Sequence, residues 1–189
     1  PGGASCPSQM PTQGKLLRSD IQGNVTTVAS GFRTPNGITK GPEGAIYVTD
    51  NQGDWLPASK LLHVEAGKFY GSRAVASDVR VMQRKETPPV VWLPQNEIGN
   101  SPTQPILMQE GPYAGQMLHG DVYHGGIKRG YLERVNNAWQ GAVFRFSGGF
   151  QAGVNRMVRG PDGALYLGEI GNPPNWGEVG KVWHGLERL

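Results

Sequence analysis

The sequence predicts an all-β fold, a β-propeller of the six-bladed type with about half of its blades in this chain. Two observations predict it. One is a segment that the chain uses twice, and the other is a composition that favours short strands and tight turns. The 189 residues include 29 Gly and 15 Pro, and only 17% are charged. Gly and Pro interrupt helices, and runs of good helix formers are missing.

The repeated segment begins at Asn36 and again at Asn155. Each copy contains a short strand, a Gly-Pro-acid-Gly turn and a second strand. In that turn Pro presets φ at the first central position, and the following Gly tolerates a positive φ. The second strand ends in a carboxylate, and a Trp follows in the next loop: Asp50 and Trp55, then Glu169 and Trp176. Repeated antiparallel pairs of this kind are typical of propeller blades.

The rest of the chain predicts further strands. Residues 1–14 are expected to form a flexible tail or linker, and 15–189 the partial propeller, with blade repeats around 36–71 and 155–189. Residues 15–20 and 24–30 predict the outer hairpin of a blade whose inner strands are missing, and 72–89 an excursion between blades. Other strands are expected at 60–65, 90–93, 106–109, 116–123, 130–135, 140–147 and 181–189, with a turn at Asn136-Asn137. One half, two full and one nearly full blade result, so other segments or chains must complete a ring.

Composition excludes several classes of function. The net charge is +3 and the basic residues are scattered, without the basic block or interleaved aromatic run of a nucleic-acid-binding surface. Cys6 is the single cysteine, so no disulfide can form within the chain. Apolar runs are too short to span a bilayer. Asn24-Val25-Thr26 matches the glycosylation sequon, a short pattern that is common by chance.

Several separate motifs carry a resemblance to a known family. They are 31–37 (GFRTPNG), the Gly-Pro-Glu-Gly turn, 49–55 (TDNQGDW), 120–130 (GDVYHGGIKRG) and Asn155-Arg156 with its Gly-Pro-Asp-Gly turn. In this order they resemble the glucose/sorbosone dehydrogenase family over residues 15–189. These are six-bladed propellers that include soluble quinoprotein sugar dehydrogenases. The chain looks closest to a subgroup of extracytoplasmic proteins joined to haem c, which implies a periplasmic or extracellular location and a cytochrome c as a possible partner.

The resemblance also implies a site. Arg33 and Asn36 match the run that grips the quinone, PQQ, although Thr34 replaces an amide residue of that run. Lys128 and Arg156 match later cofactor-binding positions, and Gly53 and Asp54 match a Ca²⁺-binding loop. The chemistry agrees, because a tricarboxylated quinone suits guanidinium and ammonium groups, and Ca²⁺ prefers carboxylate and carbonyl oxygens. The family's catalytic His base lies in an earlier blade, and no residue of this chain corresponds to it.

Alternative roles apply to several of these polar and aromatic residues. Asp50 and Glu169 are expected to bind neighbouring loop amides and so join adjacent blades. His119 and Asp121 fall on one face of a strand and His124 on the other, which argues against a shared metal. Trp55 and Trp176 are expected to be buried between blades rather than to stack on a sugar.

Two functions therefore remain open. The first is a quinoprotein-type oxidoreductase domain that oxidises a sugar or alcohol, with its ring completed by other segments or chains. The alternative is a non-catalytic propeller, a binding or assembly module in an extracytoplasmic complex. A His supplied by another segment beside a bound quinone would distinguish the first from the second.

Overall fold

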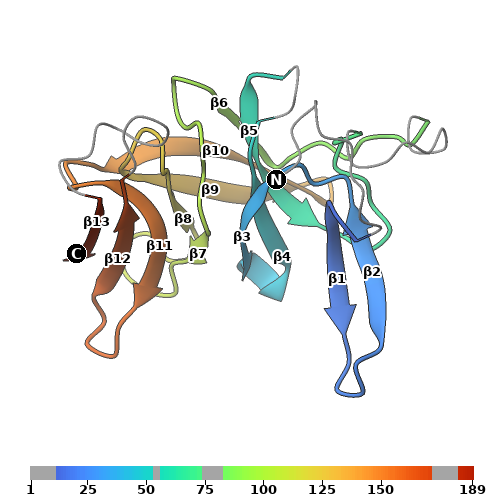
Figure 1. Cartoon of the computed structure of the whole chain (residues 1–189), viewed down its shortest axis with the longest axis horizontal. Coiled ribbons are helices and arrows are strands. Elements are labelled where there is room, and N and C mark those ends of the chain that lie inside the picture. Colours follow the sequence, from blue (N-terminus) through green and yellow to red (C-terminus); the bar gives the residue numbers. More distant parts are fainter. Residues whose placement is uncertain (1–11, 53–55, 74–82, 172–182) are drawn as a thin grey trace.

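Four antiparallel sheets make up the computed structural model, which describes residues 12–52, 56–73, 83–171 and 183–189. In chain order these sheets contain two, four, four and three strands. They follow one another across the molecule from β1–β2 to β11–β13 (Figure 1). The described part of the chain contains no helix long and apolar enough to cross a membrane.

Each sheet is built from strands that are consecutive in the chain. The first pairs β1 (Lys15–Ser19) with β2 (Val25–Ser30). The second contains β3 (Pro35–Lys40), β4 (Ile46–Asp50), β5 (Ala58–Val64) and β6 (Val91–Pro94), with the 3-10 turn η1 (Pro42–Gly44) after β3. The third contains β7 (Ile106–Leu107), β8 (Met117–Gly120), β9 (Ile127–Val135) and β10 (Ala138–Ser147). The fourth contains β11 (Gly153–Arg159), β12 (Leu165–Ile170) and β13 (His184–Arg188).

Two sequence predictions about segments 72–89 and 1–14 have different outcomes. The placement of 72–89 between blades is wrong, because β5 pairs with β6 and the excursion therefore lies within one sheet. Its polar composition could not reveal that Glu86 folds back to Lys60 on β5, 3.1 Å from its Nζ. Most of the predicted tail, including Cys6, lies outside the described residues. Gly14, at its end, accepts backbone hydrogen bonds from Gly31 and Phe32.

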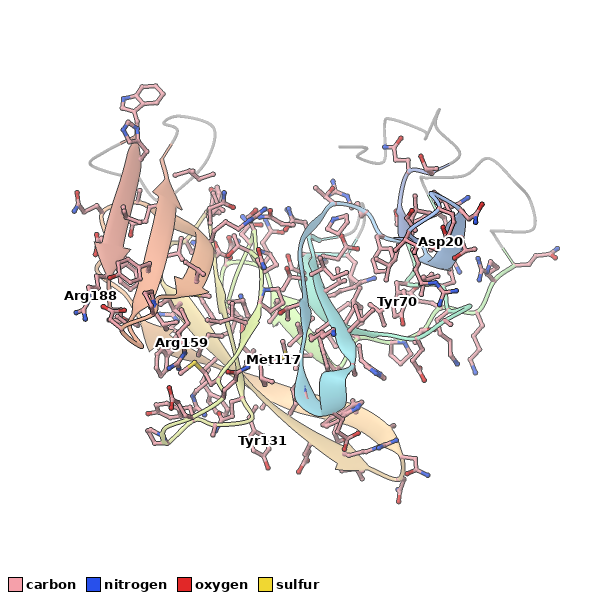
Figure 2. The ribbon with its side chains drawn as sticks, turned by 90° about the horizontal axis from the view of Figure 1, so that it is seen from below. Asp20, Tyr70, Met117, Tyr131, Arg159 and Arg188 are labelled. Carbon is pink, nitrogen blue, oxygen red and sulfur yellow. The ribbon has the colours of Figure 1, made fainter. Side chains whose placement is uncertain are left out.

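Alternate residues of each strand are buried against different neighbouring sheets. On β4, Val48 packs towards the first sheet and Tyr47 towards the third. On β8, Met117 packs towards the second sheet and Leu118 towards the fourth. Met117 is fully buried and lies near the middle of the molecule, between Asp20 at one end and Arg188 at the other (Figure 2). The period of two along a strand thus supplies apolar side chains to both faces of the inner sheets.

The repeated turns differ in backbone conformation. In both copies the Gly before Pro donates to the Ala after the turn, at 2.8 Å. Gly163 has φ 80 in the second copy, as predicted, whereas in the first both Glu43 (φ 55) and Gly44 (φ 72) are left-handed. Glu43 also accepts a hydrogen bond from Arg134 on β9, at 3.0 Å. At the other predicted turn, Asn136 and Asn137 have φ values of 49 and 63, which fits a type I′ hairpin.

Neighbouring sheets come into close backbone contact at two glycines, Gly37 on β3 and Gly120 on β8. A Cβ added to Gly37 would lie 2.0 Å from the Cα of Gln104, and one added to Gly120 would lie 2.4 Å from the Val154 carbonyl. Two buried hydroxyls bridge the same junctions. Thr49 donates to the Thr103 carbonyl at 2.9 Å, and Thr103 donates to the Val154 carbonyl at 3.0 Å. The two glycines, which carry no side chain, and the two hydrogen-bonded Thr hydroxyls therefore set the spacing between the second, third and fourth sheets.

Gly37→Ala should lower the free energy of unfolding by about 1–3 kcal/mol, because the new methyl group overpacks against backbone that cannot move aside. Urea unfolding of the purified protein measures the effect. Gly148→Ala is the matched control, since a Cβ at Gly148 meets nothing within 4 Å. Equal effects of the two substitutions would contradict a close backbone approach at Gly37.

Candidate functional site

The two copies of the repeat share an irregularity at the start of their first strands. In β3 the pairing with β4 slips between Pro35 and Gly37, and in β11 the pairing with β12 slips between Val154 and Arg156. The extra residue of each bulge is an Asn, Asn36 or Asn155. A bulge bends a strand and redirects the neighbouring side chains, and bulges are common beside binding sites. The repeat thus places the same local distortion at the same edge of two sheets.

Asn36 and Arg156 lie together at this edge, although they are far apart in the sequence. The Nη1 atom of Arg156 donates to the Asn36 side-chain oxygen at 3.1 Å. The same nitrogen donates to the Asn155 carbonyl at 2.8 Å and to its side-chain oxygen at 3.0 Å. These bonds to described residues all use Nη1, and Arg156 is an exposed residue. Arg156 is therefore held by one nitrogen, with Nε and Nη2 able to form a fork for a carboxylate.

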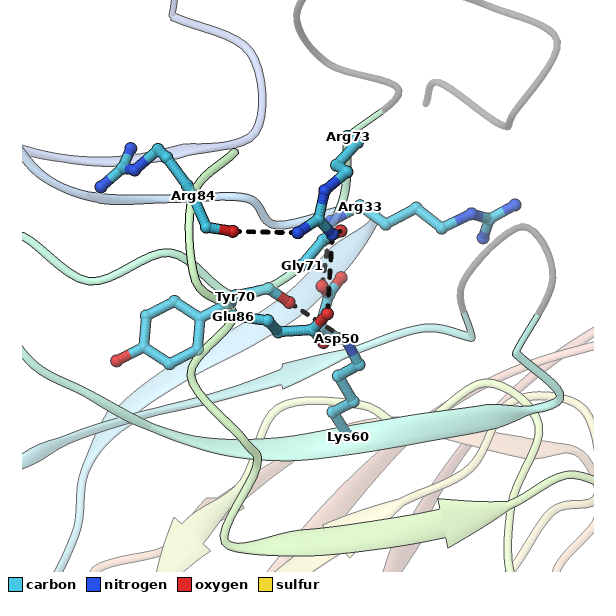
Figure 3. Close-up of polar contacts among 8 residues, drawn as sticks. All are labelled: Arg33, Asp50, Lys60, Tyr70, Gly71, Arg73, Arg84 and Glu86. Atoms are coloured by element: carbon cyan, nitrogen blue, oxygen red, sulfur yellow. Dashed lines mark hydrogen bonds and ion pairs between the residues drawn. The ribbon is translucent and has the colours of Figure 1, made fainter. Parts of the chain in front are cut away.

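Asp50 organises the segment that contains Arg33. Its carboxylate accepts the backbone amides of Arg33 at 2.9 Å and Thr34 at 2.7 Å, so it fixes the segment between the first and second sheets. The prediction that Asp50 binds loop amides is confirmed. Burial raises the pKa of Asp50 to about 6, against the opposing effects of the two amides and of Lys60. The side chain of Arg33 extends away from Lys60 and Glu86 (Figure 3).

A charged cluster lies beside Asp50 and includes a buried lysine that the sequence did not single out. Lys60 is 6% exposed, and its Nζ donates to the Tyr70 carbonyl at 3.0 Å and to Glu86 at 3.1 Å. Arg73 lies 3.7 Å from the other oxygen of Glu86 (Figure 3). The ammonium is also 5.4 Å from the ring centre of Trp92. With so many partners inside the fold, Lys60 ties the 83–89 segment to β5.

Asp121 has the role in the third sheet that Asp50 has in the second. One carboxylate oxygen accepts the amides of Asn100 and Ser101 at 2.8 and 3.0 Å, before Pro102. The other accepts the amides of Tyr123 and His124 at 2.9 and 2.6 Å. The sequence signal was available, since Arg33-Thr34-Pro35 and Asn100-Ser101-Pro102 both place two amides before a Pro. These bonds use both oxygens of Asp121.

Glu169 occupies the corresponding place in the fourth sheet but has different contacts. It is 3% exposed, and neither carboxylate oxygen has a hydrogen-bond partner within the described residues. Burial raises its pKa, and the charge of Glu187 acts in the same direction, while the nearby Ala152 amide opposes them. Asp50 therefore binds loop amides as predicted. Glu169 makes no such hydrogen bond to the residues that the structure describes.

Lys128 lies in a different environment from Asn36 and Arg156. It is on β9, only 6% exposed, and its Nζ donates to the Gly125 carbonyl. It lines a cavity of about 490 Å³ whose described walls include none of Arg33, Asn36 and Arg156. The structure thus brings two of the four predicted cofactor residues into contact and gives Lys128 its own cavity.

The predicted metal and aromatic positions fall mainly outside the described residues. Gly53, Asp54, Trp55 and Trp176 are among those not described. Within 12–52, 56–73, 83–171 and 183–189, no group of three or more His, Cys, Asp and Glu residues is arranged to hold a metal ion. His119 is fully buried, and burial lowers its pKa.

The fold is similar to that of solved sugar dehydrogenases. PQQ-bound aldose sugar dehydrogenase from Streptomyces coelicolor superposes with a TM-score of 0.64 and 15% identity, covering 99% of this chain and 57% of that chain. Soluble aldose sugar dehydrogenase from Escherichia coli gives 0.59 and 16%, covering 95% and 58%. A Thermus thermophilus oxidoreductase described as a glucose dehydrogenase gives 0.59 and 18%, covering 96% and 51%.

These similarities confirm the predicted resemblance at the level of the fold. The chain spans about half the length of these dehydrogenases. No family model matches the sequence, and no curated protein matches it.

The raised pKa of Asp50 makes a testable contribution to stability. A carboxyl whose pKa is about 6 when folded and 3.8 when unfolded stabilises the fold below pH 4, and this contribution is lost as the pH rises to 6. Asp50→Asn removes the titration. The difference in unfolding free energy between wild type and variant should therefore shrink by about 2–3 kcal/mol from pH 4 to pH 7.

Urea titrations at several pH values measure this difference. Asp162→Asn is the control, because hydrogen bonding to Arg188 lowers the pKa of that exposed carboxyl. The stabilising contribution of the Asp162 carboxylate is present above the ordinary pKa of the group and is lost only as the pH falls through the lowered pKa. The difference in unfolding free energy between wild type and Asp162→Asn should therefore not shrink between pH 4 and pH 7. A constant or widening difference for Asp50→Asn would show that burial does not dominate at this carboxyl.

Proposed function

We propose that this chain is part of a quinoprotein-type oxidoreductase that oxidises a sugar or alcohol. The observation that carries the proposal is the contact between Asn36 and Arg156, which the fold brings together from the two copies of the repeat. Both residues had been predicted as cofactor-binding positions from motifs. The similarity to a PQQ-bound aldose sugar dehydrogenase adds support for the fold that surrounds them.

The donor groups fit the quinone chemically. PQQ carries three carboxylates, and Arg156 presents an exposed guanidinium whose Nη1 is held by Asn36 and Asn155. A fixed fork of this kind binds a carboxylate with geometric selectivity. When bound, the quinone would supply the hydride acceptor for oxidation of a sugar or alcohol. Arg156 would bind and orient it, and Asp50 would hold the Arg33-Thr34 backbone beside Asn36.

Completion of the ring by other segments or chains is part of the proposal. The first sheet has two strands, and an apolar hollow of about 220 Å³ beside it is lined by residues that include Leu16, Phe32 and Ile38. At the other end, Val158 and Leu186 on the outer face of the fourth sheet are 63% and 76% exposed. These features support additional strands at the first sheet and a further sheet against the fourth. The proton acceptor for the substrate hydroxyl would come from those segments, with Ca²⁺ near Gly53 and Asp54.

Location and partners follow from the same proposal. A periplasmic or extracellular enzyme would pass its electrons to an acceptor such as a cytochrome c. A non-catalytic binding or assembly module is the alternative, and it predicts that the native particle binds no quinone.

Arg156→Met should weaken quinone binding about tenfold to a hundredfold, the loss expected for a charge-assisted hydrogen bond or pair of bonds. The measurement is a titration of the native particle with PQQ in the presence of Ca²⁺, followed by absorption, and then oxidation of aldoses with a dye as acceptor. Arg134→Met is the control, since Arg134 makes an exposed ion pair with Glu43 in the turn at the far end of β3. Failure of the wild-type particle to bind PQQ would contradict the proposal and favour the non-catalytic alternative.

A further inference from the structure

The cavity at Lys128 has the size and wall structure of a small-molecule site. Its volume is about 490 Å³, within the usual range for ligand pockets. Three segments form its walls: 96–98 after β6, 124–128 at the start of β9, and 145–149 at the end of β10. It therefore lies between the second and third sheets, at the end where β4 and β8 finish.

Two cations from neighbouring strands line this cavity. Lys128 pairs directly with Arg145 in the antiparallel register of β9 and β10, so both side chains lie on the same face of the sheet. Like charges directly opposite each other are unfavourable, and an anion seated against both would relieve that repulsion. Lys128 is only 6% exposed, and attraction between an ammonium and an anion is stronger there than in bulk water.

The two cations are held by backbone carbonyls of the cavity walls. Arg145 donates from Nη2 to the Glu97 carbonyl at 2.9 Å, and Lys128 donates to the Gly125 carbonyl. Glu97 also lines the cavity, and like Arg145 it is exposed, so solvent screens both of these charges. The buried ammonium of Lys128 is the charge that solvent screens least. The cationic side of the cavity is therefore fixed before any ligand arrives.

The loop between β8 and β9 is fixed as well. Asp121 accepts the amides of Tyr123 and His124, which sets the position of the His124 ring against Tyr123, with ring centres 4.8 Å apart. Gly126 has φ 72, and a Cβ there would lie 2.7 Å from the Ser147 carbonyl, so a side chain would not fit. The Nε2 atom of His124 is buried and makes no hydrogen bond to any residue that the structure describes.

We infer that this cavity binds a small molecule through a carboxylate or phosphate group. Lys128 and Arg145 supply the positive charge, and His124 Nε2 supplies a hydrogen-bond donor at the same wall. The site is distinct from the Asn36–Arg156 pair and goes beyond the proposed oxidoreductase activity. It also gives Lys128 a ligand other than the quinone that the family resemblance implies.

The test is calorimetric titration of the native particle with inorganic phosphate and, separately, with citrate at pH 7. Saturable binding of either anion is expected, and the one that binds more tightly identifies the group that the site prefers. Arg145→Met and Lys128→Met should each weaken that binding at least tenfold. Lys40→Met, which removes an exposed cation at the far end of β3, should change it less than twofold.

Further variants separate this site from the quinone site. Arg156→Met should leave phosphate or citrate binding unchanged, and Arg145→Met should leave PQQ binding unchanged. Absence of saturable binding of both anions would overturn the inference, as would equal weakening by Arg145→Met and Lys40→Met. Loss of anion binding in Arg156→Met would also overturn it, because the two sites would then be one. Arg145→Met keeps the test decisive if Lys128→Met does not fold.

Discussion

The close approach of backbones between successive sheets is the constraint on which the described structure depends. Gly37 faces Gln104, and Gly120 faces the Val154 carbonyl, at distances that leave no room for a side chain. The hydroxyls of Thr49 and Thr103 satisfy carbonyls at the same junctions. The last strands of the second and third sheets also pack together, with β6 against β10 and apolar side chains of the core between them. Asn36 lies next to Gly37 and Arg156 two residues after Val154, and the two meet beside these junctions.

Carboxylates at strand ends perform a second task, which is to fix the segments that enter each sheet. Asp50 and Asp121 both accept two amides that precede a Pro, and Pro cannot donate such a bond itself. Burying a carboxylate is unfavourable, and the pKa of Asp50 shows that cost even with two amides and Lys60 nearby. The loops beside the candidate sites are therefore held by buried ionisable groups.

Much of the fold could be predicted because its signals are local. The repeat at Asn36 and Asn155 identified two equivalent hairpins, and the turn residues marked where strands end. The division of strands between sheets followed only in part, because the strand at 90–93 was expected beyond an excursion between blades and instead pairs with β5. The position of 72–89 could not be predicted, because it depends on an ion pair between Lys60 and Glu86 that no periodicity reveals.

Prediction of the candidate sites was less complete for the same reason. The motifs assigned Asn36 and Arg156 to one candidate site, and in the structure the two residues are in contact. They grouped Lys128 with these residues, but the pairing of Lys128 with Arg145 depends on the register of β9 and β10. That register runs unbroken from the predicted Asn136-Asn137 turn to Arg145, because the bulge comes only after it, between Arg145 and Ser147. The strands were expected only over 130–135 and 140–147, which left Lys128 outside them.

The most direct test of the account is an experimental density map of the native particle at the edge where Asn36 and Arg156 meet. The account predicts a ring of sheets continued by other segments, with a quinone whose carboxylate contacts the Arg156 guanidinium. A closed ring in which protein side chains fill that edge and cover Arg156 would contradict it.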